Sequence, residues 1–324
     1  MKKLVTLLLV LLMLGGFGAY AAPAVAEASG QMDYVVGFAN ICESIDVIIE
    51  LGDFLVSEFA RYGMKVIRVD NNFDGATAIR NVDDLLTMGI DALVEFNVDI
   101  SVAPAIMEKC NEAGIPVIAI DIRHPGAYFF GADNQYAGEL AGEYLGQMAL
   151  ERWDGQIDGM LLVDQIASGE EGRRRIFGAV PGIQRVIPDF DDGQVYIIEG
   201  KQDAATAQTV TADFLMAHPD WKHLLILTLH DTAWLGVKAA VEVAGREDDV
   251  MLVCNAESLF VEYVRKNPEE DFCVGAVTFD LARYGKWLAP AMRDILDGKD
   301  VPENIHVEHV IVNRGNVDEL YPVN

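Results

Sequence analysis

Residues 114–121 have the sequence GIPVIAID, in which a glycine follows a helical segment, an apolar run comes next and an acidic residue ends it. The run is short, continuous and rich in Val and Ile, as expected for a strand buried on both faces of a parallel sheet. Gly114 stands where a helix ends and a left-handed residue is needed. The stretch therefore predicts one helix-to-strand unit of an α/β fold.

The same unit recurs along the chain. Apolar runs that predict strands occupy 34–39, 64–69, 91–96, 116–120, 158–164, 194–198, 223–228, 250–254, 272–278 and 306–312. Apolar residues spaced three and four apart predict helices over 46–62, 74–88, 101–113, 134–151, 203–217, 231–245 and 281–297. This alternation predicts an α/β fold with helices on both faces of its sheets.

The predicted strands are too many for one small doubly wound sheet, and one break is visible. Residues 123–127 (RHPGA) end the first series, and a second series starts near Gly155. We therefore expect two similar lobes of about 150 residues each, with a cleft between them.

The N-terminal segment has the pattern of an export signal. A basic start at 1–3 precedes an apolar run over 4–14, and small residues follow in the pattern A-x-A at 19–21 and 24–26. The alternative is an uncleaved membrane anchor, but the run is shorter than the roughly 20 residues of a bilayer span. We expect residues 1–26 to be a cleaved signal peptide and the mature protein to be exported.

The charge balance excludes one class of partner. The chain has 24 Lys and Arg residues against 51 Asp and Glu residues, which gives a net charge of −27. A surface so negative repels phosphate backbones, and the only basic cluster is 173–175, so nucleic-acid binding is not expected.

The sequence lacks the signatures of a cofactor, a metal site or a common catalytic centre. It has no H-E-x-x-H, no phosphate-binding loop, no G-x-S-x-G elbow and no G-x-G-x-x-G after a strand. The four cysteines, at 42, 110, 254 and 273, have no metal or redox spacing. Export permits disulfides, but we favour buried thiols, and we expect no cofactor and no metal.

Polar residues follow the predicted strands, where ligand contacts gather in parallel sheets. The residues that precede helices are expected to act as N-caps, namely Asp74, Asp203, Asp231 and Ser258. Five others together bring both signs of charge toward one expected cleft: Asp121, Arg123, Arg175, His230 and Glu257.

Several short motifs occur in a characteristic order from Tyr34 to Val312. They are GIDAL at 89–93, GIPVIAID at 114–121, GADN at 131–134, Arg175 before Gly178, His230-Asp231, and Phe279 before Gly285. In this order the sequence resembles the type I periplasmic binding proteins of the ribose-binding kind, the sugar-binding components of ABC importers. The resemblance implies two Rossmann-like, doubly wound parallel-sheet lobes joined by a three-stranded hinge.

The resemblance also implies the domain boundaries and a periplasmic location. The crossovers are expected near Ala132–Asn134, Thr278–Asp280 and Asn304–His306. The N-terminal lobe would comprise 32–133 plus 279–305, and the C-terminal lobe 134–278 plus 306–324.

By resemblance, Asp121 is the acidic ligand contact and Arg175 the guanidinium that donates to ligand oxygens. His230 stands where many members have Asn. The sequence departs from the family at several points: Arg123 lies one residue later than usual, Ala256 replaces an acid, and Phe279 replaces a polar hinge residue. The expected ligand-binding residues are Asn40, Glu43, Asp121, Arg123, Arg175, His230, Asn255, Glu257 and Phe279.

The predicted function is capture of a small polar ligand, a sugar or polyol, for delivery to the membrane permease of an ABC importer. The departures remove hydroxyl partners and stacking faces, which disfavours an ordinary pyranose. The alternatives are a nucleoside or amino acid as ligand, or a chemosensory receptor as partner. A rival class is an enzyme in which Asp121, His230 and Glu257 act as acid and base groups.

Overall fold

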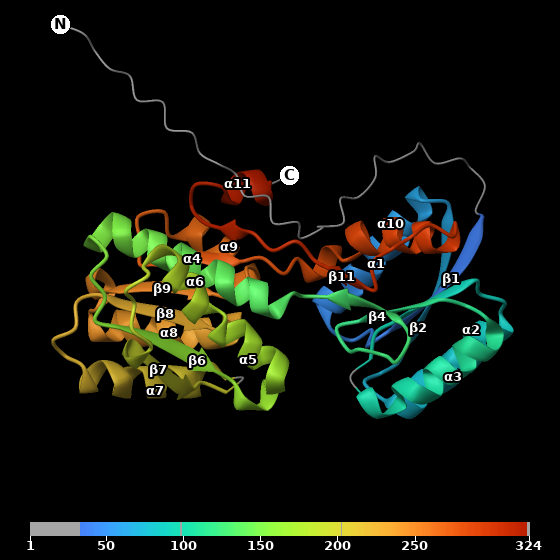
Figure 1. Cartoon of the computed structure of the whole chain (residues 1–324), viewed down its shortest axis with the longest axis horizontal. Coiled ribbons are helices and arrows are strands. Elements are labelled where there is room, and N and C mark those ends of the chain that lie inside the picture. The colour runs from blue at the N-terminus through green and yellow to red at the C-terminus, as the bar shows by residue number, and fades with distance from the viewer. Residues whose placement is uncertain (1–32, 98, 202, 323–324) are drawn as a thin grey trace, which may run out of the picture.

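The computed structural model describes residues 33–97, 99–201 and 203–322, and it contains two lobes that lie side by side (Figure 1). The predicted signal peptide lies outside the described residues. Within the described ranges, none of the helices combines the length and the apolar character that crossing a bilayer requires.

The first lobe is built on a six-stranded, wholly parallel sheet of order β11-β5-β4-β3-β1-β2. Its strands are β1 (Tyr34–Asn40), β2 (Met64–Asp70), β3 (Ala92–Glu95), β4 (Val117–Ile120), β5 (Tyr128–Gly131) and β11 (Asn304–His306). Its helices are α1 (Asp46–Arg61), α2 (Gly75–Thr87), α3 (Ala103–Ala113) and α10 (Gly285–Leu296). Helices α1 and α10 share one hydrophobic core with the sheet, and α2 and α3 share another, so both faces of the sheet are covered.

The second lobe has the sheet order β12-β10-β9-β8-β6-β7, in which only β12 runs antiparallel to its neighbour. Its strands are β6 (Gly159–Asp164), β7 (Val195–Glu199), β8 (Leu224–Thr228), β9 (Val250–Cys254), β10 (Cys273–Val277) and β12 (Ile311–Val312). One face is covered by α4 (Asn134–Trp153), α5 (Gly169–Phe177) and α6 (Ala179–Val186). The other face is covered by α7 (Ala204–Ala217), α8 (Asp231–Ala244) and α9 (Ser258–Lys266), and α11 (Val317–Leu320) follows β12.

The two sheets repeat one topology. Counted from the first strand of each lobe, both have the order 2-1-3-4-5 with one late strand added at the edge. The predicted fold of two doubly wound α/β lobes is therefore confirmed. In this topology ligands bind beyond the carboxyl ends of the strands, near the point where the strand order reverses.

Three chain segments cross between the lobes, and Figure 1 shows them side by side. They are 132–133 from β5 to α4, 278–284 from β10 to α10, and 307–310 from β11 to β12. The third lies later than expected, because the apolar run 306–312 is not one strand: its first residue ends β11 in one sheet and its last two form β12 in the other. Buried strands of both sheets contain the same kinds of apolar residue, so composition alone does not reveal where the chain passes from one sheet to the other.

All four cysteines are free and buried. Cys254 ends β9 and Cys273 begins the neighbouring β10, so they lie at opposite ends of adjacent parallel strands. The preference for buried thiols over disulfides is confirmed.

The contact between α4 and α6 depends on glycine. A Cβ built on Gly142 would overlap the carbonyl oxygen of Ala179 and lie 2.7 Å from its Cα. A Cβ on Gly146, one turn later, would meet only side-chain atoms of Val186 and Ile183, at 3.1 Å and beyond. The close approach of the two backbones therefore requires glycine at 142.

Replacing Gly142 with alanine is expected to destabilise the protein by about 2 kcal/mol, because backbone displacement outweighs the better helix propensity of alanine. Urea unfolding followed by circular dichroism measures the change. Gly146→Ala on the same helix face is the control, and its effect should be clearly smaller. Equal effects of the two substitutions would show that backbone contact at 142 is not limiting.

Candidate functional site

Asp121 follows β4 and adopts a left-handed backbone with φ 58°. Its carboxylate accepts hydrogen bonds from the Ala132 N–H and the Tyr284 hydroxyl. Solvent reaches the side chain, yet the protein around it is dense enough to raise its pKa to about 6, against the opposing effect of Arg175. Accessibility combined with desolvation is what a cleft produces. A Cβ on Gly131 would come within 2.7 Å of the Asp121 Oδ1, so the small neighbour makes room for this carboxylate.

Arg175 extends from α5 of the other lobe. Its Nε donates to the Asn134 Oδ1 at 2.8 Å, and its guanidinium lies 4.1 Å from the centre of the Phe279 ring. Burial lowers the pKa of Arg175, and the nearby Asp121 carboxylate opposes the shift. Asp121 and Arg175 thus influence each other electrostatically, although no ion pair within 4 Å joins these two described residues. The two groups belong to different lobes, since Asp121 follows β4 and Arg175 lies on α5.

Asn255 and His230 lie at the carboxyl ends of β9 and β8, beside Arg175. Asn255 is fully buried, its Nδ2 donates to the Arg175 carbonyl at 3.4 Å, and its Oδ1 has no partner among the described residues. His230 caps α8: its Nδ1 accepts from the Ala233 N–H at 3.2 Å, and its Nε2 donates to the Lys201 carbonyl at 3.2 Å. Burial lowers the His230 pKa, which favours this neutral form.

The expected N-caps are half right. Asp74 accepts from the Thr77 N–H and Asp203 from the Ala205 and Thr206 N–H groups. The predictions for Asp231 and Ser258 are wrong, since His230 caps α8 and Ser258 is already the first residue of α9. Helices α8 and α9 each begin one residue earlier than predicted, so Asp231 and Ser258 are first helical residues rather than caps.

Glu257 holds the second crossover. Its carboxylate is buried and accepts from the N–H groups of Phe279 at 2.8 Å and Asp280 at 3.0 Å, and it is also hydrogen-bonded to Tyr321. Asp280 has a left-handed φ of 47°, so these bonds stabilise a strained turn. Burial raises the Glu257 pKa. The side chain is committed to the hinge, and the structure gives it no free oxygen directed at the cleft.

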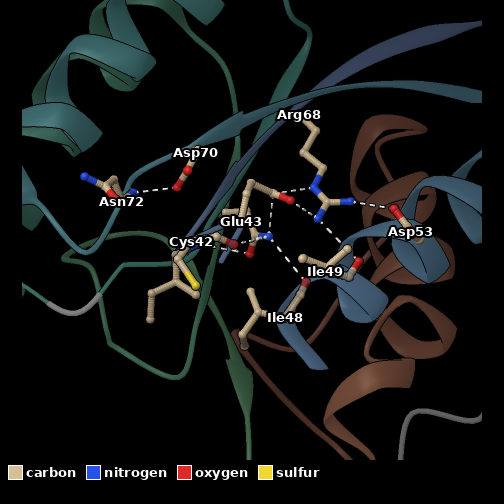
Figure 2. Close-up of polar contacts among 10 residues, drawn as sticks. Cys42, Glu43, Ile48, Ile49, Asp53, Arg68, Asp70 and Asn72 are labelled. Atoms are coloured by element: carbon tan, nitrogen blue, oxygen red, sulfur yellow. Dashed lines mark hydrogen bonds and ion pairs between the residues drawn. The ribbon is translucent and has the colours of Figure 1, made fainter. Parts of the chain in front are cut away.

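The side chains that follow β1 are also committed. The Asn40 amide is fully buried and donates to the Cys42 carbonyl and to Glu43. Figure 2 shows Glu43 paired with Arg68, whose guanidinium also reaches Asp53 at 2.8 Å. Asn40 and Glu43 therefore shape the loop after β1, and their polar atoms are already used.

Arg123 is separate from this group. Its Nη1 donates to the Asn304 Oδ1 at 2.5 Å and its guanidinium stacks on Phe129 at 3.9 Å, so it binds along the β5–β11 edge of the first lobe. Of the expected site residues, the structure gathers Asp121, Arg175, Phe279 and their neighbours into one region, and it places Arg123 elsewhere.

Two contributors were missed by sequence reasoning. Tyr284 bonds Asp121 from the far end of the second crossover, and Asn134 orients Arg175 from the first turn of α4. The GADN motif includes Asn134 and could have suggested a polar role. Tyr284 directly precedes Gly285 in the Phe279 motif, but nothing local marks its hydroxyl as a partner of a residue 163 positions earlier.

Trp234 on α8 is a core residue and offers no stacking face to a ligand. It is 1% exposed and packs edge-on against Phe260 and Tyr263 inside the second lobe. Over the described ranges, no group of three or more His, Cys, Asp or Glu side chains is arranged to hold a metal ion.

Known proteins share this architecture. The Bacillus subtilis ribose import binding protein RbsB is 24% identical over 289 residues, which cover 86% of this chain and 87% of that protein. The Pseudomonas aeruginosa D-ribose/D-allose-binding protein is 27% identical over 197 residues, 57% of each chain.

Among solved structures, the periplasmic ribose ABC transporter protein from Conexibacter woesei has a TM-score of 0.73 at 18% identity, covering 92% of this chain and 97% of that one. The solute-binding protein from Actinobacillus succinogenes with bound D-allose has a TM-score of 0.68 at 17% identity, covering 88% and 99%. These likenesses show the shared fold. The model of the family described as periplasmic binding protein domain matches residues 36–300, and the chain therefore belongs to the periplasmic binding proteins.

Proposed function

We propose that this protein is an exported binding protein that captures a sugar or polyol between its lobes and delivers it to the membrane permease of an ABC importer. The signal-like segment at 1–26 supports export to the periplasm. Several relatives are named for ribose, allose or galactose, and one similar structure holds myo-inositol.

The observation that carries the proposal is the opposition of Asp121 and Arg175. A carboxylate accepts hydrogen bonds from ligand hydroxyl groups, and a guanidinium donates to ligand oxygens. The charge of each group shifts the pKa of the other, although they belong to different lobes, which three short segments connect. A polyhydroxyl ligand between them would contact both lobes at once, and such contacts exist only when the lobes close, so the ligand stabilises the closed state.

The remaining expected residues take supporting parts in this proposal. Phe279 provides the surface on which Arg175 is stacked. Asn255 is buried beside Arg175 and its Nδ2 donates to the Arg175 carbonyl, so it supports the backbone that carries Arg175. His230, Asn40, Glu43 and Glu257 fix the loops around the cleft.

We further propose that the protein binds without turnover. An enzyme on this frame would need Asp121, His230 and Glu257 as acid and base groups. Both ring nitrogens of His230 are used in capping α8 and bonding Lys201, and the Glu257 carboxylate is used by the second crossover. Two of the three candidate groups are therefore engaged in structure, which supports binding over catalysis.

A panel of solutes tests the proposal. We expect a pentose, hexose or polyol at 100 times its Kd to stabilise the mature protein by about 2.7 kcal/mol, seen as a rise in Tm. Nucleosides and amino acids belong in the panel. If only one of these compounds stabilises the protein, the ligand is that compound and not a sugar or polyol. Recovery of chemically altered solute after incubation would favour an enzyme. If no small polar solute at millimolar concentration raises Tm, the proposal is wrong.

A further inference from the structure

His309 lies on the third crossover and contacts both of the others. It is 3% exposed. Its Nδ1 lies 2.7 Å from the carbonyl oxygen of Thr278, on the second crossover, and its Nε2 lies 3.1 Å from the backbone nitrogen of Asp133, on the first. One imidazole ring therefore joins all three segments that connect the lobes.

The two bonds require one protonation state. Because the Asp133 N–H can only donate, Nε2 must accept, and the proton must be on Nδ1, which donates to the Thr278 carbonyl. Burial lowers the His309 pKa to about 4, so the ring is neutral at physiological pH. The titratable groups that act on the His309 pKa are Arg175 from α5 and His306 from β11, which also lower it, and Asp133, which raises it.

The other hydrogen bonds at the described crossovers each join two segments. The second and third are joined by the Thr278 N–H to the Val310 carbonyl at 2.9 Å and by the Val310 N–H to the Thr278 Oγ1 at 3.0 Å. The third is joined to the end of β5 by the Val307 N–H to the Gly131 carbonyl at 3.1 Å. His309 differs from these bonds because a single rigid ring spans the first and second crossovers together.

His309 is also connected to the candidate cleft. Its ring meets the Phe279 ring edge-on at 4.7 Å between centroids, and the Arg175 guanidinium lies over the same Phe279 ring at 4.1 Å. Asp133, whose N–H it accepts from, caps α4 and directly precedes Asn134, which holds the Arg175 Nε. A displacement of His309 would therefore affect Arg175 in two ways, through the Phe279 ring and through Asp133 and Asn134 at the start of α4.

We propose that His309 is a positioning residue that couples the three crossovers, so that they move as one hinge and present Arg175 in one geometry. The coupling concerns the orientation of the lobes without any ligand, so it stands or fails separately from the proposed solute binding.

The test measures the orientation of the lobes in the full mature chain. Spin labels on cysteines introduced by Met88→Cys in the first lobe and Met216→Cys in the second report the interlobe distance distribution, and the four native thiols are buried. His309→Phe keeps the ring but removes both hydrogen bonds. Two bonds of about 1 kcal/mol each correspond to a roughly 30-fold larger population outside the native orientation, so we expect a clearly broader distribution.

Two partial variants and one control separate coupling from simple destabilisation. His309→Gln places an acceptor near the Nε2 position and His309→Asn a donor near the Nδ1 position, so each should restore part of the narrow distribution. His124→Phe is the matched control, because His124 is also buried and its Nδ1 bonds a backbone carbonyl, that of Ile122 in its own loop. It should leave the interlobe distribution unchanged.

A spectroscopic signature completes the test. Nitrogen-15 NMR of the wild-type ring should show the neutral Nδ1–H form of His309 from pH 8 down to about pH 5, below the range in which an ordinary histidine titrates. The proposal is overturned if His309→Phe leaves the distance distribution as narrow as in the wild type, if His124→Phe broadens it equally, or if His309 is found in the Nε2–H form.

Discussion

Replacing Arg175 with alanine should lower the affinity for the captured solute by a factor between about 30 and several thousand. The guanidinium is the charged donor of the second lobe, and its removal leaves Asp121 as a desolvated carboxylate without an opposing charge. Truncating one partner of such a pair costs about 2–5 kcal/mol, and 1.4 kcal/mol corresponds to a factor of ten in Kd. Isothermal titration with the solute identified by the panel measures the loss.

The controls for this prediction lie in the same structure. Arg123→Ala removes a guanidinium that binds Asn304 and Phe129 along the edge of the first lobe, so the affinity should change little. Arg175→Lys retains the charge without the fork and should recover only part of the affinity. A near-normal Kd for Arg175→Ala would show that Arg175 does not contact the ligand, and the proposed binding between Asp121 and Arg175 would then be wrong.

The same site predicts a pH dependence of binding. Desolvation raises the pKa of Asp121 to about 6, so the carboxylate is the major form at pH 7 and is protonated below pH 6. Since a protonated carboxyl accepts fewer hydrogen bonds, the affinity should fall as the pH is lowered through 6. The affinity of Asp121→Asn, measured by the same titration, should be low at pH 7 and nearly independent of pH between 5 and 7. An equally steep pH dependence in that variant would assign the effect to another group.

Glu95→Gln should stabilise the protein at alkaline pH by several kcal/mol. Glu95 ends β3, is fully buried and has no cation beside it among the residues that bond to it. Its Oε1 accepts from Asn71 at 3.2 Å and Asn97 at 3.0 Å, and its Oε2 has no partner in the described part of the chain. Desolvation outweighs these two bonds and raises the pKa from 4.5 to about 8.

The sign of the effect follows from proton binding. Between pH 4.5 and 8 the folded protein keeps the Glu95 proton, whereas the unfolded chain has released it, so the free energy of unfolding falls as the pH rises through this window. Above pH 8 the full cost is present, roughly 5 kcal/mol as an upper bound. Glutamine keeps the Oε1 acceptor and cannot ionise, so it avoids this loss.

Urea unfolding at several pH values measures the difference between Glu95→Gln and the wild type. The advantage of the variant should grow from about 1 kcal/mol at pH 5.5 to roughly 4 kcal/mol at pH 8.5. Asp121 also titrates in part of this range, but it is present in both proteins and cancels. Glu58→Gln, which removes a carboxylate paired with Arg61, is the control for the loss of one negative charge. A constant difference across the range would mean that Glu95 is already ionised in the folded protein.

The elements of the fold were readable from the sequence because they depend on local patterns. Short apolar runs and apolar spacing of three and four predicted most strands and helices to within one or two residues, as for β9 at 250–254 and α8 at 231–244. The error at 306–312 arose where the chain passes from one sheet to the other, because both sheets select the same apolar residues. The short strand β5 at 128–131 is not among the runs that predicted strands.

The candidate site divides differently. The order and spacing of motifs predicted Asp121, Arg175 and Phe279 as ligand-binding residues. In the structure Arg175 lies over the Phe279 ring and acts electrostatically on Asp121. Tertiary structure alone decided which polar atoms remain available to a ligand. The Glu43 carboxylate is bound by Arg68, 25 residues away. The Glu257 carboxylate is bound by the N–H groups of Phe279 and Asp280, 22 and 23 residues away.

The sequence by itself determined the class of fold and the export signal pattern, and its motifs predicted Asp121 and Arg175 as the acid and the guanidinium of the site, since each follows from neighbouring residues or a fixed motif. The tertiary structure alone decided that Glu257 and His309 belong to the hinge. A side chain's hydrogen-bond partner depends on which distant backbone groups folding brings within 3 Å or so, and no local pattern encodes that distance.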